Sequence, residues 1–326
     1  MARSTHIRNL TNINQLEGPQ PPLVVHAEGD WFDHILSGGC DFFEKISQTA
    51  FAHNFRPLLV NTYDVLSPSV IYTDHLQIVI GPKHPQGPRI FHARPSYIQN
   101  FWYLDPQGFY WNSSVNELTF SPDRVDCAEA TYFFNGVSGY FTRNNISLRP
   151  QNDRGALPPA DAFIPLQNIE KYPRKIHHLT SAEIIETTCR SVSGRVYVKL
   201  HPLHNEAAKQ TLRDICARFA NAVLSDASVH DLIAASNMVI SQNSAVGFEA
   251  LMHKKPVLIC AECDYHHGAL TCKTSHDLRD NIQNAMGHFH AFPFEKYFYW
   301  FLGQQMLEPQ KEEFTDRAWA RLLSTS

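Results

Sequence analysis

The chain has 326 residues, a formal net charge of −4 and 43% hydrophobic residues. This composition is typical of a folded globular protein large enough for two α/β domains, and the near balance of charge excludes a strongly basic nucleic-acid-binding surface. No apolar run approaches the roughly 18 residues that span a bilayer. The polar segment Met1 to Gln20 lacks the apolar core of a signal peptide, and the seven scattered cysteines fit a reducing cytoplasm.

Strands and helices alternate along the first half of the chain. A buried strand is predicted over 23–27 and a helix over 40–52. Further strands are expected over 57–61, 77–81 and 89–92. This alternation predicts a largely parallel sheet.

A second strand–helix series begins after 150–159, a segment rich in proline, glycine and polar residues that we interpret as a linker. Strands are expected over 161–167 and 195–200, and helices over 182–189 and 207–222. The fold class is therefore α/β, with two doubly wound Rossmann-like domains and a cleft between them.

Three regions are predicted. An N-terminal domain covers 1–158, a C-terminal domain covers 159–285, and an aromatic tail covers 286–326. The tail is expected to be helical and to pack across both domains. The alternative is a peripheral contact with a membrane, since aromatic side chains favour the headgroup zone.

The most informative motif is a polar turn at 241–244 that follows the apolar run 237–240. Ser244 is a suitable N-cap for a following helix. Gly247 lets another group approach the first turn closely. The free N–H groups and the dipole of such a turn favour a phosphate.

His201-Pro202 ends the strand predicted over 195–200. Ligands of open α/β sheets bind at the carboxyl ends of strands, where a histidine can donate to a phosphate oxygen. The turn at Ser244 is expected on the same edge. Together they predict a phosphate pocket, although a surface turn is the alternative for His201-Pro202 alone.

Several segments in the second half resemble the bacterial capsule polysaccharide biosynthesis family that includes the Kdo transferases (Kdo is 3-deoxy-manno-octulosonic acid). The resemblance covers about residues 160–275, and a weaker similarity lies at 94–108. The matching segments are Phe163–Gln167, Val198–Pro202, His230–Ile233, Gln242–Leu251 and Lys255–Val257.

This resemblance implies a GT-B glycosyltransferase that uses a nucleotide sugar, usually CMP-Kdo, and no other cofactor. His201 and Ser244 would lie near the phosphate, and Glu249 would accept from ribose hydroxyls or instead bind a neighbouring loop. Arg94, Lys199 and Arg143 are candidates to attract an acidic sugar. The implied donor-binding set is Lys199, His201, Pro202, Gln242, Asn243, Ser244, Gly247, Glu249 and His266.

The catalytic carboxylate is not assigned by the resemblance. Sugar transfer needs a base for the acceptor hydroxyl or a carboxylate nucleophile. Phe91-His92-Ala93 stands where the family has an acidic residue. The substitutes are Asp105, Glu28, Asp30 and His92; a turn-forming role is the alternative for Asp105, and a solvated loop is the alternative for Glu28 and Asp30.

We expect no metal, because Cys260, Cys263, His266, His267 and Cys272 lack a regular zinc spacing. We predict a cytoplasmic glycosyltransferase that transfers Kdo or a related acidic sugar to a lipid or glycan acceptor. A peripheral contact of this cytoplasmic protein with the inner membrane is an alternative. Two alternatives are a non-catalytic nucleotide-sugar-binding assembly protein and a sugar-nucleotide epimerase.

Overall fold

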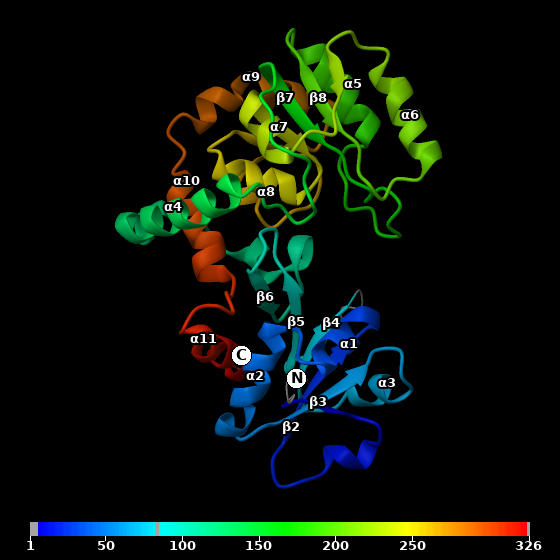
Figure 1. Ribbon diagram of the computed structural model, residues 1–326, viewed down its shortest axis with the longest axis vertical. Helices are drawn as coiled ribbons and strands as arrows, with labels where there is room; N and C mark the ends of the chain where they lie inside the picture. The colour runs from blue at the N-terminus through cyan, green and yellow to red at the C-terminus, as the bar shows by residue number, and fades with distance from the viewer. Residues whose placement is uncertain (1–5, 82–84, 325–326) are drawn as a thin grey trace. The chain divides into compact units, whose positions relative to one another are not determined.

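The computed structural model of the chain describes residues 6–81 and 85–324. The chain divides into two compact units, and each unit has its own sheet (Figure 1). Unit 1 lies within Met1–Ser96, Asn100–Val115 and Gln304–Ser326. Unit 2 comprises Tyr97–Gln99 and Asn116–Gly303.

The sheet of unit 1 has the strand order β1-β3-β2-β4-β5-β6. Every neighbouring pair is parallel except β5 with β6. The strands are β1 (Arg8–Asn9), β2 (Pro22–Ala27), β3 (Arg56–Asn61), β4 (Leu76–Ile80), β5 (Ile90–Pro95) and β6 (Trp102–Asp105). The predicted parallel sheet is confirmed, whereas the short β1 and the antiparallel β6 were not expected from the sequence.

Helices cover both faces of this sheet because alternate residues of each strand point to opposite sides. On one face, Leu23 and Val25 of β2 pack in the core that contains α1, α2 and α11. On the other face, Val24 packs with residues of α3. The helices are α1 (Gly29–Leu36), α2 (Asp41–Ala50), α3 (Leu66–Val70) and α11 (Phe314–Leu323), with short 3₁₀ turns at Ile13–Leu16, Phe51–His53 and Tyr110–Asn112.

The sheet of unit 2 has the order β12-β11-β10-β7-β8-β9, with all neighbours parallel. β8 and β9 follow β7 on one side of it, whereas β10, β11 and β12 lie in sequence order on its other side. The direction in which successive strands are added therefore reverses between β7 and β10. Ligands of doubly wound sheets bind at such a switch point. The strands are β7 (Ala160–Pro165), β8 (Val196–Lys199), β9 (Ala222–Leu224), β10 (Ser236–Ser241), β11 (Val257–Ile259) and β12 (Leu270–Thr271).

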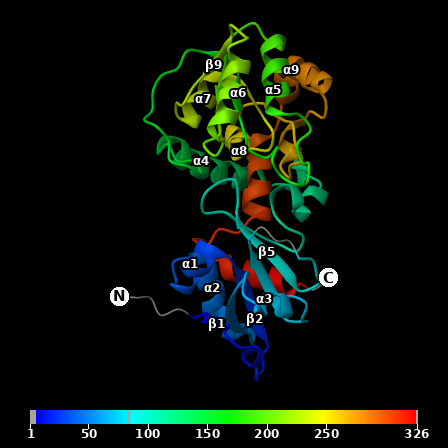
Figure 2. The ribbon, with the colours of Figure 1, turned by 90° about the vertical axis from the view of Figure 1, so that its right-hand side faces the viewer.

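In unit 2, α5, α6 and α9 pack on one face of the sheet, where they lie side by side (Figure 2). Outside that core, α7 contacts β7 and β10, and α8 contacts β10 and β11. The helices are α4 (Cys127–Arg143), α5 (Ser181–Ser191), α6 (Glu206–Cys216), α7 (Val229–Ala235), α8 (Ala245–Met252), α9 (Ser275–Phe289) and α10 (Phe294–Phe298). The 3₁₀ turns Pro122–Arg124 and His266–Gly268 also belong to unit 2. The 3₁₀ turn Ser114–Glu117 and the π-helical segment Tyr299–Gln305 each contain residues of both units.

The helix predicted over 207–222 is too long. α6 ends at Cys216, and Ala222–Leu224 form the edge strand β9. Asn221 explains the change of structure, because its Nδ2 donates to carbonyls that include those of Cys189 and Val192 and so turns the chain toward the sheet.

The compact units divide the chain differently from the predicted boundary between residues 158 and 159. α4 belongs to unit 2 because its Phe134 ring packs against Phe298, with centroids 5.4 Å apart. The aromatic tail is also divided: residues up to Gly303 belong to unit 2, and those from Gln304 belong to unit 1. Most aromatic side chains of the tail are buried in protein. No helix in the described part of the chain has the length and hydropathy to cross a membrane.

Trp319 offers a test of how the end of the chain stabilises unit 1. It is 1% exposed, its Nε1 donates to Thr49 Oγ1 over 2.8 Å, and it stacks on Phe55. Trp319→Ala should lower the free energy of unfolding by about 3–5 kcal/mol in urea denaturation, because it opens a large cavity. The neighbouring, exposed Leu323→Ala should change it by less than about 0.5 kcal/mol. Equal effects of the two substitutions would contradict the packing role of Trp319.

Candidate functional site

A hydrogen-bonded cluster of polar residues lies at the switch point of unit 2. Gln167 follows β7 and Asn243 follows β10, and the backbone N–H of Asn243 donates to Gln167 Oε1 over 3.2 Å. The carbonyl of Gln167 accepts from Nε2 of His204, which lies beyond β8, over 2.8 Å. Gln167 therefore connects, through these hydrogen bonds, the loops that follow the adjacent strands β10, β7 and β8.

His201 presents an oriented hydrogen-bond donor in this cluster. The backbone N–H of Leu203 donates to His201 Nδ1 over 3.2 Å, so a neutral ring carries its proton on Nε2. Pro202 and Leu203 form the turn between His201 and His204. The ring of His201 is partly exposed, so its Nε2–H can reach an acceptor oxygen of a ligand.

The surroundings of His201 are electropositive. Burial, followed by the charges of Arg149, His204 and Lys171, lowers the pKa of His201 to about 4. The ring is therefore neutral at pH 7, with Nε2 as its only N–H donor. Arg149 and Lys171 are exposed cations, and both favour an anionic ligand near His201.

The three cations named from the sequence have other contacts. Lys199 Nζ donates to the carbonyls of Asp226 and Ala227 over 2.9 and 2.6 Å. Arg143 Nε donates to a carbonyl within α4. Arg94 lies over an aromatic ring of unit 1. The electrostatic contribution at His201 comes from Arg149, His204 and Lys171, none of which was predicted.

The turn before α8 forms as predicted. Ser244 is the N-cap, and its side chain accepts from the backbone N–H of Val246 over 3.2 Å. Asn243 Nδ2 donates to the carbonyl of Glu262 over 2.9 Å. Ala245 and Val246, the first helical residues, are partly exposed. The amino end of α8 is thus accessible in its first turn and held in place by its flanking residues.

Gly247 is required by a neighbouring side chain. A Cβ at this position would lie 2.6 Å from Tyr265 Oη and 3.0 Å from Ser241 Oγ. The Tyr265 hydroxyl donates to the carbonyl of Ser244 over 2.8 Å. The group that approaches the first turn closely is therefore Tyr265, and the glycine gives no separate evidence for a ligand.

Glu249 lies in the interior of unit 2. It is 1% exposed and its Oε1 accepts from Ser147 Oγ over 2.7 Å. Burial raises the pKa of Glu249 to about 8. Of the two roles considered from the sequence, binding to a neighbouring loop corresponds to these contacts; the ribose role stays a prediction.

Two other members of the predicted donor-binding set hold loops in place. Gln242 Nε2 donates to Glu170 Oε1 over 3.1 Å and to the carbonyl of Leu179 over 3.0 Å. His266 Nε2 lies 3.4 Å from the carbonyl of Asn116. These contacts hold both side chains in place, and among the described residues Gln242 Oε1 is buried without a hydrogen-bond partner.

In unit 1, Glu28 occupies the corresponding switch point between β2 and β4. It follows β2, it is partly exposed, and its Oε2 accepts from Tyr63 Oη over 2.7 Å. A Cβ on Gly81, which follows β4, would lie 3.5 Å from the Glu28 carboxyl carbon. Asp30 is exposed in the first turn of α1.

The other two catalytic candidates, Asp105 and His92, are buried and face each other across β5 and β6. Asp105 accepts from the backbone N–H groups of Gln107, Gly108 and Ser114, and from Ser114 Oγ over 2.6 Å. These contacts match the turn-forming alternative and disfavour Asp105 as a base. His92 Nε2 donates to the carbonyl of Pro85 over 3.1 Å.

Among the residues that the structure describes, no cluster of three or more metal-ligating side chains could hold a metal ion. The residues that sequence reasoning missed are Gln167, His204, Arg149 and Lys171. His204 had a local signal, because it lies three residues after His201 on the same turn. Arg149 and Lys171 lie far from His201 in sequence, and only the fold relates them to it.

The fold is similar to that of a solved glycosyltransferase. KpsC from Thermosulfurimonas dismutans, a beta Kdo 2,7 transferase, matches with a TM-score of 0.51 and 14% identity, over 78% of this chain and 84% of that one. The beta Kdo 2,4 transferase of Thermosulfurimonas dismutans KpsC matches with a TM-score of 0.47 and 14% identity, over 81% of this chain and 89% of that one. The predicted class of two doubly wound α/β units is confirmed by the two sheets and the first of these likenesses; the cleft stays a prediction.

A match to a family model lies within the sequence of unit 2. Residues 177–294 match the family described as capsule polysaccharide biosynthesis protein. The predicted resemblance to that family is confirmed for this segment, which includes His201, Ser244 and Glu249. A search of curated proteins found no match.

Gly247→Ala tests the contact with Tyr265. The added Cβ overpacks the first turn of α8, so we expect a loss of about 1–3 kcal/mol in the free energy of unfolding, measured in urea. In a Tyr265→Phe background the clashing hydroxyl is absent, and Gly247→Ala should cost less. Gly287→Ala, where nothing lies within 4 Å of the new Cβ, is the control. An equal cost of Gly247→Ala in both backgrounds would contradict this explanation.

Glu249→Gln tests the protonation of the buried carboxyl group. The pKa of Glu249 rises from 4.5 to about 8 in the folded state, so between these values the folded protein holds a proton that the unfolded chain releases. The contribution of Glu249 to the free energy of unfolding of the wild type therefore falls as pH rises through this range. Glu249→Gln does not ionise, so it should gain stability relative to wild type, by about 1 kcal/mol or more at pH 8.

Urea denaturation of both proteins at pH 5 and pH 8 measures this difference. Glu312→Gln, at an exposed position, is the matched control. A difference between Glu249→Gln and wild type that stays constant with pH would show that Glu249 is ionised in the folded protein.

Proposed function

We propose that the protein is a glycosyltransferase of surface polysaccharide synthesis that takes its sugar from a nucleotide donor. The phosphate of the donor binds at the switch point of unit 2. The observation that carries this proposal is the oriented Nε2–H of His201, which lies in a loop that Gln167 ties to the start of α8. A donor histidine and a helix amino end together suit a phosphate group.

The proposed donor is CMP-Kdo or a nucleotide sugar with a related acidic sugar. Two features support an acidic donor. The positive charges of Arg149 and Lys171 act on His201. The similar solved protein, KpsC, is a beta Kdo transferase.

The proposed catalytic carboxylate is Glu28. Transfer requires that the acceptor hydroxyl lose a proton to a base, or that a carboxylate carry the sugar as a covalent intermediate. Glu28 is at the ligand edge of the unit 1 sheet, and Tyr63 holds one of its oxygens. The acceptor is a lipid or glycan, and we place the reaction in the cytoplasm at the inner face of the membrane.

Nucleotide binding is the direct test. In a thermal-shift screen of CMP, UDP, GDP and ADP, we expect one nucleotide, CMP, to raise the unfolding temperature; saturation at 100 times Kd contributes about 2.7 kcal/mol. His201→Ala removes a hydrogen bond to a charged phosphate and should weaken binding at least about tenfold. His276→Ala, on the exposed side of α9, should bind like the wild type. No stabilisation by any nucleotide, or unchanged binding by His201→Ala, would contradict the proposal.

A non-catalytic nucleotide-binding protein is the second candidate, and the engagement of Asp105 in a turn favours it. The two functions differ in turnover. A transferase releases CMP from CMP-Kdo when an acceptor is present, and Glu28→Gln stops this release without loss of nucleotide binding. A binding protein releases no CMP with any acceptor.

A further inference from the structure

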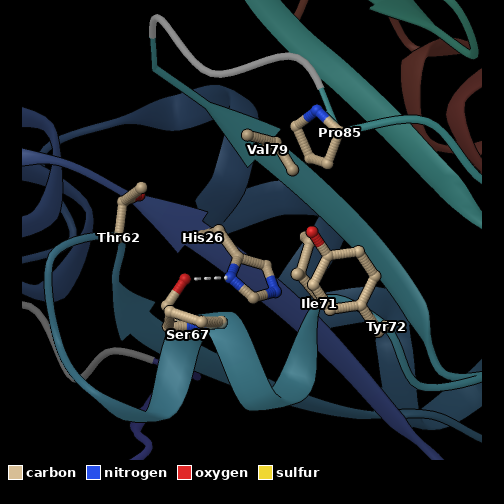
Figure 3. Close-up of a pocket in the computed structure, with 8 residues that line it drawn as sticks. His26, Thr62, Ser67, Ile71, Tyr72, Val79 and Pro85 are labelled. Carbon is tan, nitrogen blue, oxygen red and sulfur yellow. Dashed lines mark hydrogen bonds between the residues drawn. The ribbon is translucent and has the colours of Figure 1, made fainter.

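A pocket of 400 Å³ lies in unit 1 on the face of the sheet that α3 covers (Figure 3). His26 of β2 lines it together with Thr62, which follows β3, and Ser67 of α3. The pocket is near the carboxyl ends of β2 and β3, the sheet edge that also carries Glu28. Its polar groups come from three elements, and their hydrogen bonds determine which ligand groups they can bind.

Gln77 determines the protonation of His26. Gln77 Nε2 donates to the carbonyls of Ile71 and Thr73 over 3.2 and 3.1 Å, so its Oε1 is the acceptor. His26 Nε2 lies 2.9 Å from this oxygen and must donate to it. Because burial lowers the pKa of His26 to about 4, the ring is neutral at pH 7 and Nδ1 carries a lone pair.

Ser67 is consequently a hydrogen-bond acceptor toward the pocket. Its Oγ lies 2.9 Å from His26 Nδ1, so its single hydroxyl proton is directed to that nitrogen (Figure 3). The remaining lone pairs of Ser67 Oγ can accept from a ligand hydroxyl.

Thr62 supplies a second polar group that the protein does not use. Its Oγ1 is buried and has no hydrogen-bond partner among the residues that the structure describes, and the residue is 5% exposed. A buried hydroxyl without a partner costs roughly 1–3 kcal/mol. Since Thr62 lines the pocket, a ligand hydroxyl there would remove this cost.

The remaining lining residues that the structure describes are apolar and uncharged. Pro68, Ile71, Val79 and Pro85 line the pocket with the ring of Tyr72, which is 86% exposed. No acidic or basic side chain apart from the neutral His26 lines it within the described part of the chain. The described lining residues offer no counter-ion to a carboxylate or phosphate, which would lose its hydration here, and this is unfavourable.

We propose that this pocket binds an uncharged sugar ring of the acceptor. An apolar face of the ring packs against Tyr72 and Ile71, and one hydroxyl group donates to Ser67 Oγ and accepts from Thr62 Oγ1. The assignment of the ring to the acceptor rests on the proposed function. The pocket thereby selects a neutral sugar at the site that receives the transferred residue.

Ligand-detected NMR titration of the full chain tests the proposal without a donor or turnover. The neutral probes are methyl glucoside, methyl galactoside and methyl N-acetylglucosaminide. Methyl glucuronide is the charged counterpart of methyl glucoside. We expect saturable binding of at least one neutral glycoside and at least tenfold weaker binding of the glucuronide. If no neutral glycoside binds, or if the glucuronide binds as tightly as the glucoside, the proposal is overturned.

Thr62 variants locate the binding. Thr62→Val preserves the shape of the side chain and removes the hydroxyl, so it should weaken glycoside binding at least fivefold while the unfolding temperature stays equal or rises. Thr62→Ser keeps the hydroxyl and should retain binding. Ser69→Ala, at an exposed position of α3, is the control. Equal affinity of Thr62→Val and wild type would show that the sugar binds elsewhere and would overturn the proposal.

The two proposals can fail separately. Nucleotide binding that depends on His201, without glycoside binding, overturns the sugar pocket and retains the transferase. Glycoside binding that depends on Thr62, in a protein that binds no nucleotide, retains the pocket as a neutral-sugar site and overturns the transferase.

Discussion

The hydrogen bond from the backbone of Asn243 to Gln167 Oε1 is the constraint on which the candidate site depends. It connects the loops that leave β7 and β10, the two strands from which the sheet of unit 2 grows in opposite directions. A parallel sheet with this order leaves a gap between the diverging loops at its carboxyl edge. Because Gln167 also binds His204, the turn that carries His201 is held against the same gap.

Burial determines the chemistry of several groups in both units. It lowers the pKa of His201 and of His26 to about 4, so each ring is neutral with its proton on the nitrogen that its neighbours select. It raises the pKa of Glu249, because a carboxylate without solvent is costly. The same physical effect therefore provides a donor at His201, an acceptor at Ser67 and a carboxyl group that remains protonated near neutral pH.

Much of the fold was predictable because its strands are strongly apolar. The strands around Val25, Leu59 and Val239 are buried on both faces, and such runs are recognisable without knowledge of their partners. The N-cap at Ser244 was also predictable from local sequence, because capping involves residues only two or three positions apart. The short edge strands β1, β9 and β12 were not predicted, because they are stabilised by pairing with distant strands rather than by their own composition.

The sequence alone determined the α/β class, the order of the main elements and the family resemblance of about residues 160–275, since each depends on local periodicity or on neighbouring residues. The family match over residues 177–294 confirms that resemblance. Only the tertiary structure decided what the single side chains do. It assigned Asp105 to a turn, explained Gly247 by Tyr265, brought Arg149 and Lys171 near His201, and formed the pocket around His26. These contacts join residues that are far apart in sequence, and their geometry exists only once the sheets have formed.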